Sequence, residues 1–288
     1  MTDNMNIQWY PGHMTKTRRQ IEADLKQVDA VCEIVDARIP LSSRNPDIDA
    51  ICGNKPRMIV LNRMDLADPA ATKKWRDYFK SKGMAVLATD CKSRQGINEF
   101  TPAARVACAE KLARDAARGM NRPLRVMIVG IPNVGKSTLI NQISGRKGAK
   151  AENRPGVTRG KQWVTVDSGL QLLDTPGILW PKFDDPQVGM MLAYTGAVKE
   201  GVIDSEELSC RLMELLHKYY PQVLADRYKV EAEPGTPGYA LLEQAGRKRG
   251  LLLRGGEVHT ERMAKVLMDE FRSGKLGKFT LEMPEDAT

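Results

Sequence analysis

The sequence lacks long apolar runs, has few aromatic residues and contains only five cysteines. No stretch approaches the roughly 18 consecutive apolar residues of a membrane-spanning helix. The polar start, Met1 to Gln8, has no apolar core of a secretory signal. The cysteines are odd in number, widely spaced and form no C-x-x-C pair: Cys32, Cys52, Cys91, Cys108 and Cys210. This pattern argues against a zinc site or a disulfide framework, so we expect a cytoplasmic protein without a membrane span.

Positive charge is concentrated in the first two thirds of the chain. The formal net charge is +8 over 288 residues. Residues 1–187 hold 30 Lys and Arg against 20 Asp and Glu, whereas residues 188–288 hold 14 against 16. A basic first part suits a polyanionic partner such as nucleic acid. A surface that is basic only for solubility stays open, because no RNA-binding signature motif is visible. The length allows two domains.

The chain is organised around residues 125–138. Val126 to Val129 is a short apolar run typical of a buried strand, Gly130 to Ser137 fits G-x-x-x-x-G-K-[ST], and an apolar helical pattern starts at Leu139. A P-loop requires this strand–loop–helix context, and a plain glycine-rich turn is the alternative. The loop and the following helix N-terminus turn backbone N–H groups toward phosphates. The residues predicted to bind them are Asn133, Val134, Gly135, Lys136, Ser137 and Thr138.

Two elements after the P-loop suit Mg²⁺ and the γ-phosphate. Thr158, in a basic glycine-containing stretch, fits a switch residue whose hydroxyl meets Mg²⁺ and whose N–H meets the γ-phosphate. Asp174 begins a D-x-x-G motif, with Asp174 in the Mg²⁺ shell and the N–H of Gly177 at the γ-phosphate. Lys136 would reach the β- and γ-phosphates, and Ser137 would hold Mg²⁺.

Asn62-Arg63-Met64-Asp65 follows a buried strand predicted at 57–61 and is close to N-K-x-D, the guanine-reading element of GTPases. Asp65 can accept hydrogen bonds from both N1–H and the N2 amino group of guanine, a pairing worth about 1–3 kcal/mol. Asn62 would contact the base edge and tie loops together. Arg63 replaces the usual Lys, and its aliphatic stem can still cover the base. An ordinary Asn-x-x-Asp turn after a strand is the alternative.

A second base-contacting loop is expected after the strand at 84–88, in Thr89-Asp90-Cys91-Lys92-Ser93. It departs from the usual Ser-Ala-Lys. Backbone N–H groups near Asp90 and Cys91 would still meet guanine O6. Further strands are predicted at 30–36, 162–167 and 171–173, and helices at 15–28, 73–82, 100–118, 187–200, 205–219, 238–247 and 260–272.

The order of these motifs is unusual, because the guanine-reading loops precede the P-loop, the switch Thr and the D-x-x-G motif. In this order, and in Trp-Tyr-Pro-Gly-His-Met (9–14), Asp-Ala-Arg-Ile-Pro (36–40) and Pro-Gly-Val-Thr (155–158), the chain resembles the YlqF family of circularly permuted GTPases. The resemblance is close over residues 9–180 and weaker beyond. It implies an α/β, circularly permuted P-loop GTPase domain over 1–184 (motif order G4-G5-G1-G2-G3) and a smaller all-helical, RNA-binding domain over 185–288.

The resemblance also implies a function. It suggests Mg²⁺-dependent hydrolysis of GTP to GDP and phosphate during late assembly of the large (50S) ribosomal subunit, with rRNA and ribosomal proteins as partners. Ordinary GTPases orient water with a Gln just after D-x-x-G, but this position is Ile178, so we expect slow intrinsic hydrolysis. The resemblance assigns a K⁺ ion to Asn133 and a catalytic role on the ribosome to His13, beside Lys136 and Thr158.

Purely structural roles stay open for these residues, and other classes of function stay open for the protein. His13 is equally well placed as a turn residue, and Asn133 could bond within its own loop. A P-loop enzyme acting on a small molecule, such as a kinase, would need an acceptor-site base that is not apparent. An RNA-binding GTPase switch that does not act on the ribosome is the other alternative.

Overall fold

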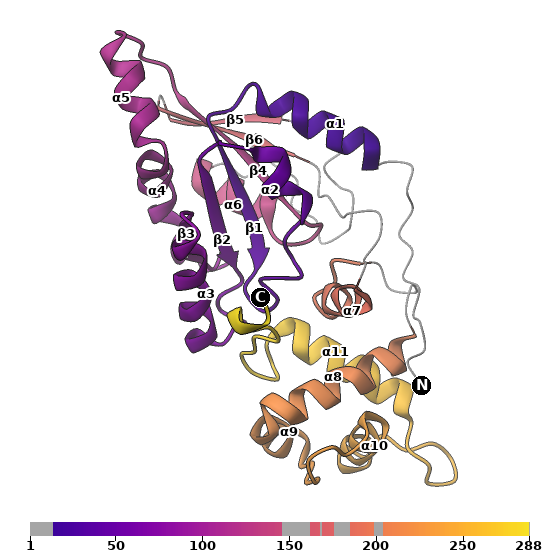
Figure 1. Ribbon diagram of the computed structural model, residues 1–288. Helices are drawn as coiled ribbons and strands as arrows, with labels where there is room; N and C mark the ends of the chain where they lie inside the picture. The colour runs from indigo at the N-terminus through magenta and orange to yellow at the C-terminus, as the bar shows by residue number, and fades with distance from the viewer. Residues whose placement is uncertain (1–13, 146–161, 168, 176–184, 199–203, 288) are drawn as a thin grey trace.

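A computed structural model describes residues 14–145, 162–167, 169–175, 185–198 and 204–287 (Figure 1). At its centre lies a six-stranded sheet in the order β3-β2-β1-β4-β6-β5. Neighbouring strands are parallel, except that β5 runs antiparallel to β6. The strands are β1 (Ala30–Asp36), β2 (Arg57–Asn62), β3 (Ala85–Thr89), β4 (Leu124–Gly130), β5 (Gln162–Asp167) and β6 (Leu170–Asp174).

The central strands are apolar because helices cover both faces of the sheet. All seven residues of β1 are buried. Cys32 and Ile34 pack on the face that carries α4 (Phe100–Ala107) and α6 (Lys136–Ser144). Val31 and Val35 pack on the opposite face, which carries α1 (Met14–Leu25), α2 (Asp47–Cys52) and α3 (Pro69–Ser81).

The helix expected over 100–118 is broken at Cys108. Its second half, α5 (Ala109–Ala117), contains no buried residue, whereas Cys108 is 1% exposed and belongs to the main hydrophobic cluster. The break therefore falls at the last fully buried residue of the predicted helix, and α5 packs on the cluster only through partly buried residues such as Leu112 (Figure 1).

Within the described residues from 185 onward, five α-helices form the C-terminal region, and they lie beyond the carboxyl ends of β1 and β2 (Figure 1). They are α7 (Pro186–Tyr194), α8 (Ser205–Tyr219), α9 (Pro221–Tyr228), α10 (Gly238–Lys248) and α11 (Thr260–Ser273). No helix is predicted over 221–228 from the sequence, because a proline directly after the helix at 205–219 is also typical of a helix end. Proline is well suited to the first position of a helix, where its missing N–H costs nothing, and Pro221 begins α9 in this way.

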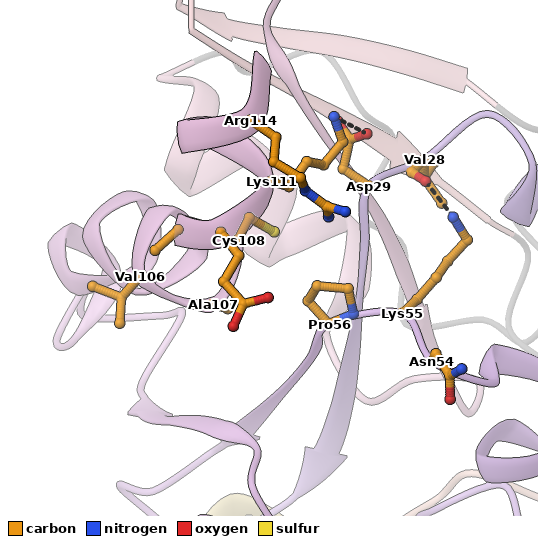
Figure 2. A pocket seen from close by; sticks show the side chains of 12 residues that line it. Val28, Asp29, Asn54, Lys55, Pro56, Val106, Ala107, Cys108, Lys111 and Arg114 are labelled. Atoms are coloured by element: carbon orange, nitrogen blue, oxygen red, sulfur yellow. Dashed lines mark hydrogen bonds and ion pairs between the residues drawn. The ribbon is translucent and has the colours of Figure 1, made fainter. Parts of the chain in front are cut away.

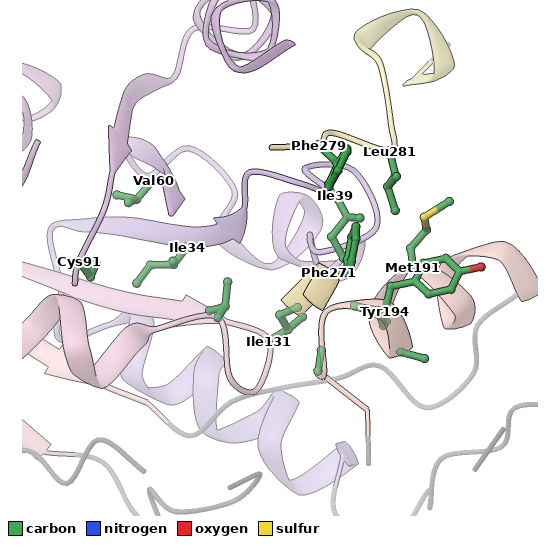
Figure 3. Packing of buried hydrophobic residues seen from close by; sticks show 14 of the residues in the cluster. Ile34, Ile39, Val60, Cys91, Ile131, Met191, Tyr194, Phe271, Phe279 and Leu281 are labelled. Atoms are coloured by element: carbon green, nitrogen blue, oxygen red, sulfur yellow. The ribbon is translucent and has the colours of Figure 1, made fainter. Parts of the chain in front are cut away.

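One hydrophobic cluster joins the sheet to the C-terminal helices (Figure 3). It runs from Ile34 and Val60 in the sheet, through Ile131 in the P-loop, to Tyr194 and Phe271 in the helical region. The two predicted domains thus share a continuous core. The boundary expected after residue 184 stays a prediction, because residues 176–184 lie outside the described part of the chain. Over the described residues, no helix has the length and apolar character needed to cross a membrane.

The chain returns to the sheet after α11. Residues 276–282, which we call the C-terminal strap, lie against the loops that follow β1 and β2. The backbone N–H of Leu281 donates to the Arg38 carbonyl at 2.8 Å, and the Trp75 indole N–H donates to the Glu282 carbonyl at 2.9 Å. Trp75 itself is completely buried. The strap is therefore an integral part of the fold.

The carboxylate of Glu282 is buried at the end of the strap. It accepts hydrogen bonds from the backbone N–H groups of Leu41 (2.7 Å) and Ser42 (3.1 Å) and from the Ser42 hydroxyl. These donors favour the ionised form, but burial outweighs them and raises the pKa of Glu282 to about 7.

This raised pKa makes stability depend on pH. Because the folded-state pKa lies above that of an unfolded Glu, the folded protein binds more protons between these two values, so the contribution of Glu282 is fully present at about pH 4 and is lost as the pH rises through 7. We expect the wild-type free energy of unfolding to fall relative to Glu282→Gln by about 3 kcal/mol between about pH 4 and pH 8. Urea unfolding of both proteins across this range measures the difference, and a pH-independent difference would contradict it.

Candidate nucleotide-binding site

The predicted motifs meet at one edge of the sheet. Gly130, Asn62, Thr89 and Asp174 are the last residues of β4, β2, β3 and β6. These four strands are parallel to one another and to β1. Ligands of open α/β sheets bind outside the carboxyl ends of the strands, so this edge is the expected position for a nucleotide.

Two glycines of the P-loop are required by its geometry. Gly130 has φ 155°, and a Cβ there would lie 2.5 Å from the carbonyl oxygen of Ile34. Gly135 has φ 105°, and a Cβ there would lie 2.4 Å from Nδ2 of Asn62. Any side chain at either position would collide with the neighbouring strand end. The pattern G-x-x-x-x-G thus reflects close packing of the loop against β1 and β2 as well as its curvature.

Helix α6 begins directly after this loop. Gly135 is its N-cap, and no side chain caps the first turn. The first N–H groups of a helix lack partners within the helix, so those of Lys136, Ser137 and Thr138 suit a phosphate. Val134, just before them, is only 2% exposed and packs the loop into the core.

The ammonium group of Lys136 is folded back onto the loop. Its Nζ donates to the carbonyl oxygens of Gly130 at 3.1 Å and Ile131 at 2.8 Å. Burial lowers the pKa of Lys136 to about 8, although the charge of Asp174 opposes this shift. A phosphate beside Nζ would supply the negative charge that this buried cation lacks.

Asp174 and Ser137 form a small oxygen-lined group at the end of β6. The Ser137 hydroxyl lies 3.5 Å from Oδ2 of Asp174. Oδ1 of Asp174 is buried and has no hydrogen-bond partner among the described residues. Burial raises the pKa of Asp174, and Lys136 opposes the shift. Mg²⁺ prefers oxygen ligands, so a divalent cation fits this orphaned carboxylate oxygen and the neighbouring hydroxyl.

Asn62 joins the three loops of the site. Its Nδ2 donates to the carbonyl of Val134 in the P-loop at 2.7 Å. Its Oδ1 accepts from the Thr89 hydroxyl at 3.1 Å and lies 3.4 Å from the backbone N of Cys91. The side chain is 3% exposed. The structure therefore places Asn62 as a tie between loops.

Arg63 and Asp65 occupy the rim of the site. Arg63 has a left-handed backbone (φ 62°), and its guanidinium donates to the carbonyl of Asn133 at 2.7 Å. The backbone N–H of Met64 donates to the carbonyl of Thr89. Asp65 is half-buried, and its pKa is raised by burial and by the charge of Asp90. A ligand that donates two hydrogen bonds to the Asp65 carboxylate would stabilise its ionised form.

The second base loop is a compact turn. The side chain of Asp90 accepts from the backbone N–H groups of Lys92 (2.8 Å) and Ser93 (3.2 Å). Asp90 and Cys91 are buried, and burial raises the pKa of Cys91 to about 12. The thiol therefore stays neutral.

One contact of the site was not predicted. Nδ2 of Asn133 donates to the carbonyl of Gly196, which follows α7, at 2.8 Å. No local pattern announces a bond between residues 63 positions apart. The predicted residues His13, Thr158 and Gly177 lie outside the described part of the chain, so their roles stay predictions.

A cavity lies at the opposite edge of the sheet (Figure 2). It has a volume of about 500 Å³ and is lined by residues that precede β1 and β2, such as Asp29 and Lys55, and by the junction of α4 and α5. Lys55 donates to the carbonyl of Val28 at 2.8 Å, and Lys111 lies 3.4 Å from Asp29. The cavity is at the amino ends of the strands, so it is separate from the P-loop.

The chain is similar to known GTPases over most of its length. The family described as 50S ribosome-binding GTPase matches residues 125–220. Ribosome biogenesis GTPase A of Priestia megaterium is 46% identical over 98% of this chain and 99% of its own. The Thermotoga maritima protein of the same name is 34% identical over 98% and 96%. The chain belongs to the ribosome biogenesis GTPase A family.

Solved structures of the YlqF family have the same fold. GNP-bound YlqF from Thermotoga maritima is 30% identical, with a TM-score of 0.63 over 94% of this chain and 99% of that chain. A GDP-bound YlqF structure is 29% identical, with a TM-score of 0.66 over 93% and 100%. The circularly permuted GTPase fold predicted from the motif order, and the GTP hydrolysis implied by the resemblance, are thereby confirmed for this member of the ribosome biogenesis GTPase A family.

Lys136 provides a test of the site that depends on pH. Free protein at about pH 8.5 holds much of Lys136 deprotonated, and phosphate binding restores its charge. We expect GDP binding at this pH to take up about half a proton or more, and almost none at about pH 6.5. Calorimetry in two buffers of different ionisation enthalpy measures this uptake. Lys136→Arg keeps a permanent charge and is the matched control; equal uptake by both proteins would contradict the assignment.

Proposed function

We propose that this protein is a cytoplasmic GTPase that acts in late maturation of the large (50S) ribosomal subunit, binding its rRNA and ribosomal proteins. The main support is the guanine-reading loops tied by Asn62 to a P-loop of the ribosome biogenesis GTPase A family. The family description 50S ribosome-binding GTPase supports the choice of subunit. The net charge of +8 suits an RNA partner.

The nucleotide would bind along the carboxyl edge of the sheet. Phosphates would accept from the backbone N–H groups of Val134 to Thr138, and Lys136 would transfer its ammonium contacts from the loop carbonyls to the β- and γ-phosphates. The carboxylate of Asp65 would accept from N1–H and N2 of guanine, whereas backbone N–H groups of Asp90 and Cys91 would meet O6.

Ser137, Asp174 and Thr158 would hold Mg²⁺, which would supply positive charge to neutralise the phosphates when bound. Asp174 suits this role because it carries a buried oxygen without a partner among the described residues. The Ser137 hydroxyl lies 3.5 Å from Oδ2 of Asp174, so both groups are close enough together to reach one ion.

Water would have to be positioned by a group other than the residue after D-x-x-G, because Ile178 cannot hydrogen-bond. We infer that His13 takes this role when the protein is docked on the ribosome, with the N–H of Gly177 at the γ-phosphate. Oδ1 of Asn133 would bind K⁺, which supplies a positive charge near the phosphates. The bond from Nδ2 of Asn133 to Gly196 would fix the orientation of this amide.

Turnover with and without ribosomal subunits tests the proposal. Because the chain lacks a water-orienting Gln, we expect GTP hydrolysis in potassium buffer to be slow alone and to rise by about tenfold or more with purified large subunits, as an added catalytic group lowers the barrier. His13→Ala should lose this stimulation and keep GDP affinity.

Three comparisons make the result specific. Small subunits and an unrelated structured RNA should not stimulate, and sodium in place of potassium should reduce the rate. Intact GTP binding with no response to large subunits, but a response to other RNA, would replace the ribosome by another RNA partner. Competition of excess ATP with GTP would contradict a guanine-specific site.

A further inference from the structure

The C-terminal strap touches the segment that follows the guanine-reading motif. The carbonyl of Leu66, the residue after Asp65, accepts from the backbone N–H of Phe279 at 3.0 Å. The side chain of Leu66 lies against the end of α11, where a Cβ at Gly274 would be 2.5 Å from its Cδ2. Leu66 is therefore held on its backbone by the strap and on its side chain by α11.

Thr280 connects three parts of the molecule. Its hydroxyl accepts from the backbone N–H of Asp68 at 3.3 Å and donates to the carbonyl of Ala37 at 3.2 Å. Its backbone N–H donates to the Tyr220 hydroxyl at 3.1 Å, and that hydroxyl donates to the Thr280 carbonyl at 2.9 Å. Thr280 is 1% exposed. It thus binds the loops after β2 and β1 to the helical region.

The strap is anchored by residues on both sides of Thr280. Phe279 stacks on Phe271 of α11 with ring centroids 5.9 Å apart, and Tyr220 meets Phe279 edge-on at 5.1 Å. Beyond Thr280, the backbone of Leu281 and the carboxylate of Glu282 bind the loop that includes Arg38, Leu41 and Ser42. The strap is therefore better anchored than the turn it supports.

The turn itself has few bonds of its own between Asp65 and α3. Leu66 N–H donates to the Arg63 carbonyl at 2.9 Å, and Asp68 caps α3 through Ala70 at 2.8 Å. A carboxylate that makes two parallel hydrogen bonds to a base must be held to within about 0.5 Å of its productive position. Met64 bonds to Thr89, and the buried Ala67 belongs to the same hydrophobic cluster as Trp75; the bonds from Phe279 and Thr280 add to this support.

We propose that the C-terminal strap is a specificity-determining part of the guanine site, in which Thr280 is a positioning residue that holds the turn after Asp65 so that its carboxylate discriminates guanine. This inference rests on the proposed role of Asp65 as the guanine reader. It assigns selectivity to a segment more than 200 positions away in the sequence, since Thr280 and Asp68 are 212 residues apart.

Inosine diphosphate (IDP) isolates this effect. It keeps N1–H, O6 and the phosphates of GDP but lacks the N2 amino group, so the ratio of GDP to IDP affinity reports on the second hydrogen bond to Asp65. Thr280→Val removes the hydroxyl and keeps the shape. We expect the ratio to fall by about tenfold, with IDP affinity changed by about twofold or less. Thr280→Ser, which keeps the hydroxyl, should restore the ratio.

Two further variants guard against a loss of folding. Tyr228→Phe removes a hydrogen bond to Glu270 within the helical region and leaves the bonds of the strap intact, so its ratio should equal that of the wild type. Tyr220→Phe removes the hydrogen bonds between the Tyr220 hydroxyl and the Thr280 backbone, but the Thr280 hydroxyl keeps its bonds to Asp68 and Ala37. We expect this variant to lower the ratio by about threefold. Tyr220→Phe carries the test if Thr280→Val does not fold.

The two proposals fail in different ways. An unchanged ratio, or equal losses of GDP and IDP affinity, in a folded Thr280→Val protein would overturn the role of the strap. A wild-type protein that does not prefer GDP over IDP would instead overturn the role of Asp65.

Hydrogen exchange supplies an independent measurement on the wild type. Coupling between two sites is reciprocal, so GDP should slow exchange of the Phe279 and Leu281 amides by about threefold or more, and IDP should slow it less. Equal exchange with GDP, with IDP and without nucleotide, under conditions where both bind, would also overturn the proposal.

Discussion

The buried amide of Asn62 is the constraint on which the nucleotide site depends. It bonds to the P-loop at Val134 and to the second base loop at Thr89, and it is packed directly against Gly135. Phosphate-binding and base-binding loops come from separate strands, so their relative position must be fixed by a side chain that reaches both. A buried amide without these partners would cost about 1–3 kcal/mol. The same bonds that satisfy Asn62 therefore set the distance between the phosphate and base subsites.

The permuted order places the guanine-reading strands first in the chain and the P-loop strand later, yet β1 and β4 are neighbours in the sheet. Because the strands that carry the base loops come before the P-loop, the chain after β6 forms the helical region. The strap then brings the last residues back to the loops after β1 and β2. As a result, a site whose motifs all lie before residue 180 depends on contacts made after residue 275.

The sequence indicates the residues of the candidate site more directly than it indicates the contacts around them. Gly130, Lys136 and Asp65 belong to short motifs because phosphates and guanine impose a fixed spacing on a backbone. The buried strands follow from runs such as Ala30 to Asp36, which both faces of a parallel sheet require. The strap contains only a brief apolar alternation at Phe279 and Leu281, and nothing local shows that its partners are Leu66 and Arg38. Pro221 is ambiguous in the same way. A proline after a helix suits either the end of that helix or, as here, the start of the next one.

Besides the hydrophobic cluster that includes Ile131, two groups of hydrogen bonds among the described residues connect the nucleotide site with the helical region, one at each end of the site. The strap supports the base side through Leu66 and Asp68. On the phosphate side, Asn133 donates to the carbonyl of Gly196. Arg272 of α11 donates to the carbonyls of Ala193 and Tyr194, which come just before Gly196. Both contacts lead to α11, so a partner that shifts this helix would disturb base and phosphate subsites together. Because such coupling is reciprocal, a partner that favours one nucleotide state must itself bind more tightly in that state.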